Sequence, residues 1–212
     1  MRLFADRADA GRQLAEELRD YEGRTDVVVL GLPRGGVPVA YEVASRLGVP
    51  LDVFLVRKLG VPGHVELAMG AVAPGGIEVL NQDLIDELAI PVASVEQVAA
   101  RERQELERRD RVFRGERARA QLTGKTVILI DDGLATGATM EAAVAALRPM
   151  QPAAIVVAVP VGARETCDRL APLAEKLICL ATPAPFAAVG QWYEDFSQTT
   201  DDEVKALLLR FS

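Results

Sequence analysis

Residues 126–139 read TVILIDDGLATGAT, and this stretch predicts the fold more strongly than any other part of the chain. Residues 127–130 form an apolar run rich in β-branched side chains, which is typical of a strand covered on both faces. Two acids follow where this strand is expected to end, and a helix is expected over 140–148. Ligands of open α/β sheets bind at this carboxyl edge.

The acids are Asp131 and Asp132, whose carboxylates can accept hydrogen bonds from the vicinal hydroxyls of a ribose. A loop of small residues after them offers backbone N–H groups and two hydroxyls at a helix N-terminus, which is a favourable place for an anion. This loop consists of Ala135, Thr136, Gly137, Ala138 and Thr139. Asp-Asp-Gly by itself is more typical of an ordinary turn than of a binding site, and Thr and Asp are common N-cap residues. The apolar run before the acids and the T-G-x-T after them favour a sugar phosphate site.

Length and composition exclude several classes of protein. A chain of 212 residues, half of them hydrophobic, predicts one domain over 1–212 with a sizeable core. We expect no membrane span, because no apolar run approaches ~20 residues, and no signal peptide, because the N-terminus lacks an apolar segment. A formal charge of −7 argues against nucleic-acid binding.

Cysteine and histidine are scarce. Cys167 and Cys179 are far apart in sequence, which indicates a reducing cytoplasm rather than a disulfide scaffold. The single histidine, His64, excludes a His-rich zinc site and is expected to be an exposed polar residue.

The remaining periodicities predict an α/β fold. Strands over 27–31 and 51–56 with a helix over 37–47 form a βαβ unit, which implies a parallel sheet. Further strands are expected over 154–159 and 176–181, a hairpin over 69–80, and helices over 9–20, 163–174 and 201–209. A long helix over 94–119 carries charges of both signs, which favours a solvated or subunit-facing helix over nucleic-acid binding.

A second glycine-rich segment follows the first strand. Arg34, Gly35 and Gly36 lie in a loop that a strand-to-helix turn explains by itself, or whose N–H groups and guanidinium bind an anion. Anion binding by this loop is favoured because strands 27–31 and 127–130 should share one sheet, which brings the loops after them to the same edge. Arg57 and Lys58 follow the second strand, where a basic pair is commonly a solvated edge. Here the pair would be the third strand end on the same edge.

The string 126–139 resembles the phosphoribosyl pyrophosphate motif of the type I phosphoribosyltransferases: a hydrophobic run, two acids, a spacer and T-G-x-T. The resemblance implies a Rossmann-like parallel sheet of about five strands flanked by helices, with a small hood. We expect a helical and flexible-loop insertion at about 60–122 and a C-terminal hood element at about 182–212. The whole chain is similar to prokaryotic predicted members of the family whose acceptor is not generally known.

The resemblance also implies roles for particular residues. The loop with Arg34, Gly35 and Gly36 would bind pyrophosphate, and Arg57 and Lys58 would face it, ahead of a mobile active-site loop over 61–69. Asp131 and Asp132 would hold the ribose hydroxyls and Mg²⁺, the latter through those hydroxyls or water, and the loop 135–139 would bind the 5′-phosphate. In the mobile loop, Glu66 is equally suited to a structural and a catalytic role. Trp192 and Tyr193 are core residues by default and candidates for stacking on the acceptor.

The expected activity is transfer of the phosphoribosyl group of phosphoribosyl pyrophosphate to a nucleobase or other amine, with release of pyrophosphate. No signature of a particular purine or uracil enzyme identifies this small-molecule acceptor. One alternative is a regulatory protein that binds phosphoribosyl pyrophosphate without transferase activity, and another is a phosphorylase or hydrolase acting on a ribose phosphate. We expect a cytoplasmic homo-oligomer, a dimer, in nucleotide metabolism.

Overall fold

A computed structural model describes residues 2–115 and 117–211, except for the side chains of Val65 and Glu66. Its main sheet has five parallel strands in the order β2-β1-β6-β7-β8. The strands are β1 (Val27–Gly31), β2 (Leu51–Val53), β6 (Thr126–Ile130), β7 (Ala154–Val161) and β8 (Lys176–Ala181). The predicted α/β class and the count of about five strands are confirmed.

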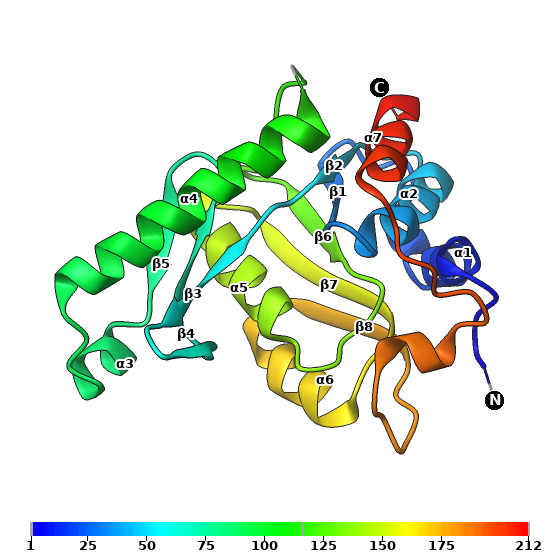
Figure 1. Cartoon of the computed structure of the whole chain (residues 1–212). Helices are drawn as coiled ribbons and strands as arrows, with labels where there is room; N and C mark the ends of the chain where they lie inside the picture. Colours follow the sequence, from blue (N-terminus) through cyan, green and yellow to red (C-terminus); the bar gives the residue numbers. More distant parts are fainter. Residues whose placement is uncertain (1, 116, 212) are drawn as a thin grey trace.

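Helices cover both faces of this sheet (Figure 1). One face carries α1 (Arg7–Glu17), α2 (Gly36–Leu47) and α7 (Asp201–Arg210), and the other carries α5 (Ala138–Leu147) and α6 (Arg164–Leu170). Alternate residues of each strand enter the two cores: Ile128 and Ile130 pack with α2, whereas Val127 and Leu129 pack with α5. Burial on both faces is the reason that these strands are apolar throughout.

A second layer of structure projects from the core, at the left of Figure 1. It is called the arm below and comprises β3 (Arg57–Val61), β4 (His64–Ala73), β5 (Ile77–Leu80), α3 (Gln82–Glu87) and α4 (Val92–Arg114). The three strands form an antiparallel sheet, and Leu59, Met69 and Val95 belong to a small core of their own beneath α4.

Three expectations about the arm and its approach are wrong. The second strand ends at Val53 rather than at residue 56, so Arg57 and Lys58 open β3 of the antiparallel sheet. Residues 61–69, expected as a mobile loop, belong to the β3–β4 hairpin, where Val61 pairs with His64. The long helix ends at Arg114, five residues earlier than expected, where Gly115 takes a φ of 59°.

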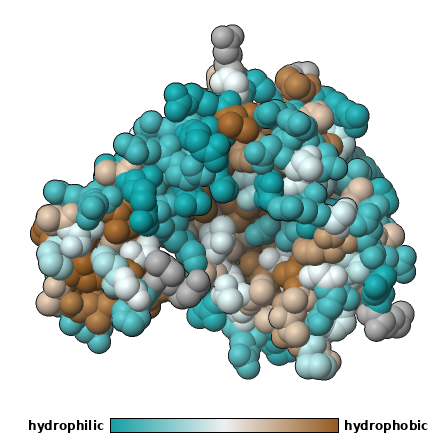
Figure 2. All heavy atoms as spheres, viewed as in Figure 1, coloured by the Kyte–Doolittle hydropathy of each residue, from teal (hydrophilic) through white to brown (hydrophobic). Residues whose placement is uncertain are grey.

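The arm also carries exposed apolar side chains. Figure 2 shows hydrophobic residues gathered on this part of the surface, while the outer side of α4 is hydrophilic. The exposed large hydrophobic residues of the arm are Leu67, Leu80, Leu88 and Val92. None of the helices in the described part of the chain combines the length and apolar character needed to cross a membrane.

Candidate functional site

The ends of β1 and β6 bring the two predicted loops together. The strands pair in parallel, with Gly31 opposite Ile130, and Leu32 N donates to Ile130 O at 2.8 Å. A Cβ added to Gly35 would lie 1.9 Å from Asp132 Oδ2, and one added to Gly36 would lie 2.8 Å from Asp131 Cα. The loop of residues 34–36, called the glycine loop below, therefore packs directly against both acids. The absence of side chains at its two glycines makes that approach possible.

Asp132 is held by two residues that lie far from it in sequence. Arg7 Nε donates to its Oδ2 at 2.8 Å, and Tyr193 Oη donates to its backbone oxygen at 2.6 Å. The Arg7 guanidinium lies 3.9 Å above the ring of Phe196 and also donates to Ser197 O. Sequence reasoning missed Arg7, because an arginine in the first turn of an amphipathic helix looks like any solvated residue.

The two carboxyl groups have raised pKa values. Burial raises the pKa of Asp131 well above its usual range, and the neighbouring Asp132 charge adds to the effect. Burial also raises the pKa of Asp132, against the opposing influence of the Arg7 guanidinium. A site that confines two acids in this way favours a ligand that brings cationic or hydrogen-bond-donating groups.

The loop from Ala135 to Thr139 has its N–H groups available. Gly137 has a φ of 74°, and a Cβ there would meet the Thr166 methyl at 2.6 Å, so glycine is required on both counts. On its outer side, α6 holds the loop by its carbonyl oxygens: Thr166 Oγ1 donates to Ala135 O, and Arg169 to Thr136 O. Among the described residues, the backbone N–H groups of 135–139 make no hydrogen bond. They precede or open α5, an arrangement suited to a phosphate.

Arg57 and Lys58 come close to the loop 135–139 from a part of the fold that differs from the one expected. They do not extend a strand of the parallel sheet; instead, the arm folds back over α5. Both then line a cavity of about 250 Å³ together with Thr139. Arg57 Nε donates at 2.8 Å to the buried carboxylate of Glu102 on α4.

Arg34 lines a different cavity from Arg57 and Lys58. Its side chain is partly exposed and approaches Asp201 at 3.6 Å. Together with Arg7, Gly35 and Phe196 it lines an open cavity of about 340 Å³. The basic residues predicted to share one site therefore lie in two cavities.

The C-terminal aromatic residues divide into two groups. Tyr193 is 2% exposed and packs between Phe4 and Phe196, at centroid distances of 5.3 and 5.0 Å. It offers no free ring face, so the expected stacking on an acceptor is wrong for Tyr193, which instead supports Asp132. Trp192, in the short 3₁₀ helix Val189–Trp192, is partly exposed and packs against Phe186.

The β3–β4 hairpin also contains His64 and Glu66. His64 is exposed, as the sequence predicts. Glu66 lies in β4, but its side chain is outside the described part of the structure.

The donor set fits Mg²⁺ held jointly with a phosphorylated substrate. Within residues 2–115 and 117–211, apart from the side chains at 65 and 66, no three His, Cys, Asp or Glu side chains cluster as a metal site. Mg²⁺ is commonly bound by one or two carboxylates together with substrate phosphates rather than by an all-protein cage. Asp131 and Asp132 supply that number of carboxylates beside the loop 135–139, whose N–H groups are available among the described residues.

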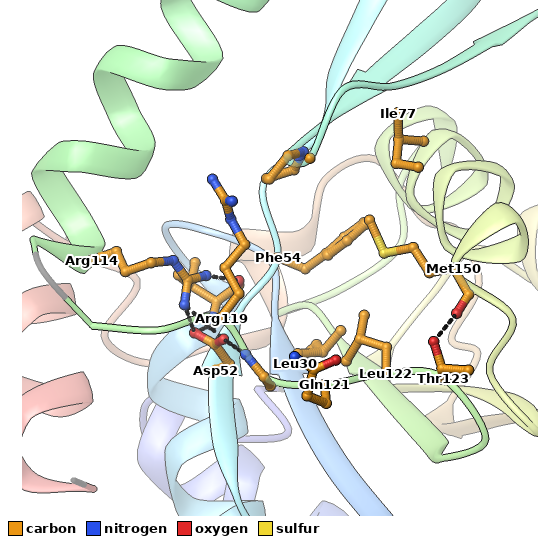
Figure 3. Close-up of a pocket in the computed structure, with 14 residues that line it drawn as sticks. Leu30, Asp52, Phe54, Ile77, Arg114, Arg119, Gln121, Leu122, Thr123 and Met150 are labelled. Carbon is orange, nitrogen blue, oxygen red and sulfur yellow. Dashed lines mark hydrogen bonds and ion pairs between the residues drawn. The ribbon is translucent and has the colours of Figure 1, made fainter.

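A further cavity lies away from these loops, beneath the end of α4 (Figure 3). It has a volume of about 290 Å³ and apolar walls that include Phe54, Leu122 and Met150. At one end Arg114 Nη1 donates to both carboxylate oxygens of Asp52, at 2.7 and 2.8 Å. Both side chains are buried, and this ion pair joins α4 to β2.

Replacing Gly36 by alanine tests the close approach of the two loops. The new Cβ would meet Ile130 O at 2.6 Å, and backbone atoms at a strand end cannot move aside as a flexible side chain can. We expect Gly36→Ala to cost about 1–3 kcal/mol in the free energy of unfolding, measured by urea denaturation, and to weaken binding at the acids. Gly23→Ala serves as the control for a loss of stability away from the site: nothing lies within 4 Å of its Cβ, but its φ of 67° strains a side chain, and it should leave ligand binding intact. Equal ligand affinity in both variants would show that the loop does not depend on this contact.

Comparison with known proteins agrees with this geometry. A family model described as phosphoribosyl transferase domain matches residues 3–69 and 69–189. A predicted phosphoribosyl transferase of Mycobacterium tuberculosis is 51% identical over 210 residues, which is 99% of this chain and 47% of the relative. The chain spans about half the length of the curated relatives it matches. A bifunctional protein PyrR of Brevibacillus brevis is 37% identical over 65 residues, 31% of this chain and 36% of its own.

Solved structures give the same result for the fold. The protein TT1426 of Thermus thermophilus is 47% identical, with a TM-score of 0.92 and all of both chains covered. A hypoxanthine-guanine phosphoribosyltransferase of Bacillus anthracis is 11% identical, with a TM-score of 0.50 over 84% of this chain and 80% of its own. At that identity the second likeness concerns the fold alone.

Proposed function

Because the chain belongs to the phosphoribosyl transferase family and has its type I fold, we propose that it transfers the phosphoribosyl group of phosphoribosyl pyrophosphate to a nucleobase or other amine. The supporting observation is the contact between the glycine loop and the acid pair, beside a loop with unused N–H groups. This arrangement offers hydrogen-bond acceptors for a ribose between two anion-binding segments.

The residues suit the bond changes of this reaction. The acceptor nitrogen forms a bond to the anomeric carbon of ribose while the bond from that carbon to pyrophosphate breaks, so the sugar becomes cationic and the leaving group anionic. Asp131 and Asp132 would accept hydrogen bonds from the ribose hydroxyls and oppose the developing positive charge. Residues 135–139 would fix the 5′-phosphate through their N–H groups. Mg²⁺, when bound, would supply positive charge to the pyrophosphate oxygens.

Positive side chains would bind the leaving group from both sides. Arg34 with the N–H groups of its loop is one source, and Arg57 with Lys58 is the other. Trp192, and Glu66 from the hairpin, remain our candidates for contact with the acceptor. We also propose that the protein acts in the cytoplasm as a homodimer; its two cysteines are free, which suits a reducing compartment.

Release of pyrophosphate tests the proposal. The protein is incubated with phosphoribosyl pyrophosphate, Mg²⁺ and each of a panel of purines, pyrimidines and other amines. We expect release with at least one acceptor and none from Asp131→Asn/Asp132→Asn. Tight donor binding without release for any acceptor would instead favour the regulatory protein. Release of pyrophosphate without an acceptor would favour a hydrolase.

A further inference from the structure

Glu102 occupies an unusual position on α4. From Val95 to Phe113 the buried residues of this helix recur every three or four positions, and they are Val95, Ala99, Glu102, Leu106, Asp110 and Phe113; Arg114 is buried as well. Glu102 falls in the middle of this stripe and is 7% exposed. Burial of a carboxylate costs free energy that an apolar side chain at the same position would not. Its presence therefore calls for a reason other than packing.

The partners of Glu102 are two arginines. Its Oε2 accepts from Arg57 Nε at 2.8 Å, and its Oε1 accepts from Arg101 Nε at 3.1 Å. Each carboxylate oxygen thus fixes one guanidinium group. The nearby Glu105 differs, because it binds Arg108 and Arg109 on the solvent-exposed side of the helix.

The two arginines that bind Glu102 line a cavity beside the loop 135–139. Arg57, Arg101, Glu102 and Lys58 line the cavity of about 250 Å³ whose opposite wall includes Thr139. Three cations surround one carboxylate, which leaves an excess of two positive charges. Among the described residues, Arg57 Nη1 and the Lys58 ammonium have no hydrogen-bond partner, so both are available to an anion.

We propose that Glu102 is a positioning residue that holds Arg57 and Arg101 against the phosphate groups of the donor, and that Arg101 is a further donor-binding residue. The inference rests on the proposed function. Glu102 itself touches no substrate: it removes the rotational freedom of two long side chains before the ligand arrives, which lowers the entropic cost of binding. The arm thereby delivers its positive charge to a fixed place beside Thr139.

Calorimetric binding of phosphoribosyl pyrophosphate with Mg²⁺ to the full chain tests this role. Glu102→Gln keeps the shape and one acceptor oxygen, and Glu102→Leu suits the apolar stripe but keeps no acceptor. We expect Kd to rise about tenfold for Gln, which keeps one acceptor oxygen, and further for Leu, which keeps none. Glu105→Gln is the matched control on the same helix and should leave Kd unchanged.

A double-mutant cycle separates positioning from a structural effect. In an Arg57→Ala/Arg101→Ala background, Glu102→Gln should have no further effect on Kd. The ³¹P resonances of the bound donor should shift in Glu102→Gln and not in Glu105→Gln. Wild-type affinity in both Glu102 variants, or an undiminished effect in the double-alanine background, would overturn the positioning role alone. Absence of donor binding to the wild type would instead overturn the proposed function.

Discussion

Phosphoribosyl pyrophosphate with Mg²⁺, at about 100 times its Kd, is expected to raise the melting temperature of the wild-type protein by about 5–10 °C, and Asp131→Asn/Asp132→Asn is expected to abolish the shift. A ligand at that concentration stabilises the folded state by about 2.7 kcal/mol. For a domain of this size each kcal/mol corresponds to about 2–4 °C. Differential scanning fluorimetry measures the shift. A wild type that shows none contradicts the assignment of the donor.

The expected loss follows from the geometry of the acid pair. Asn can still accept a hydrogen bond at each position, but it carries no negative charge to oppose a cationic ribose or to bind Mg²⁺. Asp132→Asn also removes the ion pair with Arg7, so Asp131→Asn by itself is the matched control for that change. If the double variant keeps the full shift, the acids do not hold the ligand.

The stability of the Asp131→Asn variant relative to the wild type is expected to depend on pH. Burial raises the pKa of Asp131, so the folded protein binds more protons than the unfolded chain between the ordinary value of about 3.9 and the raised value. The stability of the wild type therefore falls as the pH rises through the folded pKa. We expect Asp131→Asn without ligand to be more stable than the wild type at pH 7, and this advantage to vanish below about pH 4. Urea denaturation at the two pH values measures it, and an advantage that is unchanged at low pH contradicts the raised pKa.

Arg114→Met is expected to lower the free energy of unfolding by about 3–5 kcal/mol. The substitution leaves the buried Asp52 carboxylate without the two charge-assisted hydrogen bonds from Arg114 Nη1. Among the described residues, Asp52 then keeps the hydrogen bonds that it accepts from the N–H groups of Val53 and Ala120. Arg114 also donates to Asp110, but Asp110 keeps its ion pair with Arg119. The change therefore loosens the end of α4 from β2 and leaves Asp52 without its guanidinium partner.

Arg109→Met is the matched control, since Arg109 lies on the same helix and pairs with Glu105 on its exposed side. Its effect should stay within about 0.5 kcal/mol. Adding Asp52→Asn to Arg114→Met should recover part of the loss, because it removes the uncompensated charge. A loss for Arg114→Met no greater than that for Arg109→Met would show that the buried pair contributes little to holding the arm.

The strands of the parallel sheet could be predicted because each is a short apolar run with its own end signals. β1 and β8 have the bounds expected, and β6 differs by one residue. The positions of the two acids and of the T-G-x-T loop could be predicted as well, because the end of β6 and the start of α5 fix them. Gly137 shows the local part of such a motif, because its φ of 74° by itself favours glycine.

The arm could not be predicted in the same way. Phe54, Leu55 and Val56 continue the apolar run of the second strand without a break, yet the chain leaves the sheet after Val53. The turn after Val61 then pairs residues that sequence reasoning assigned to a loop. Antiparallel pairing and the packing of α4 decided this, and both depend on residues distant in the sequence.

The sequence by itself determined the parallel sheet, the acid pair and the loop that follows it, because periodicity and turn chemistry act over a few neighbouring residues. Only the tertiary structure decided what surrounds them: Arg7 on Asp132, Tyr193 as a buried support, and Glu102 holding Arg57 opposite Thr139. The physical reason is that a sequence offers each charged side chain many residues with which it could pair equally well. The packing of α1, the C-terminal segment and α4 against the sheet selects one of them.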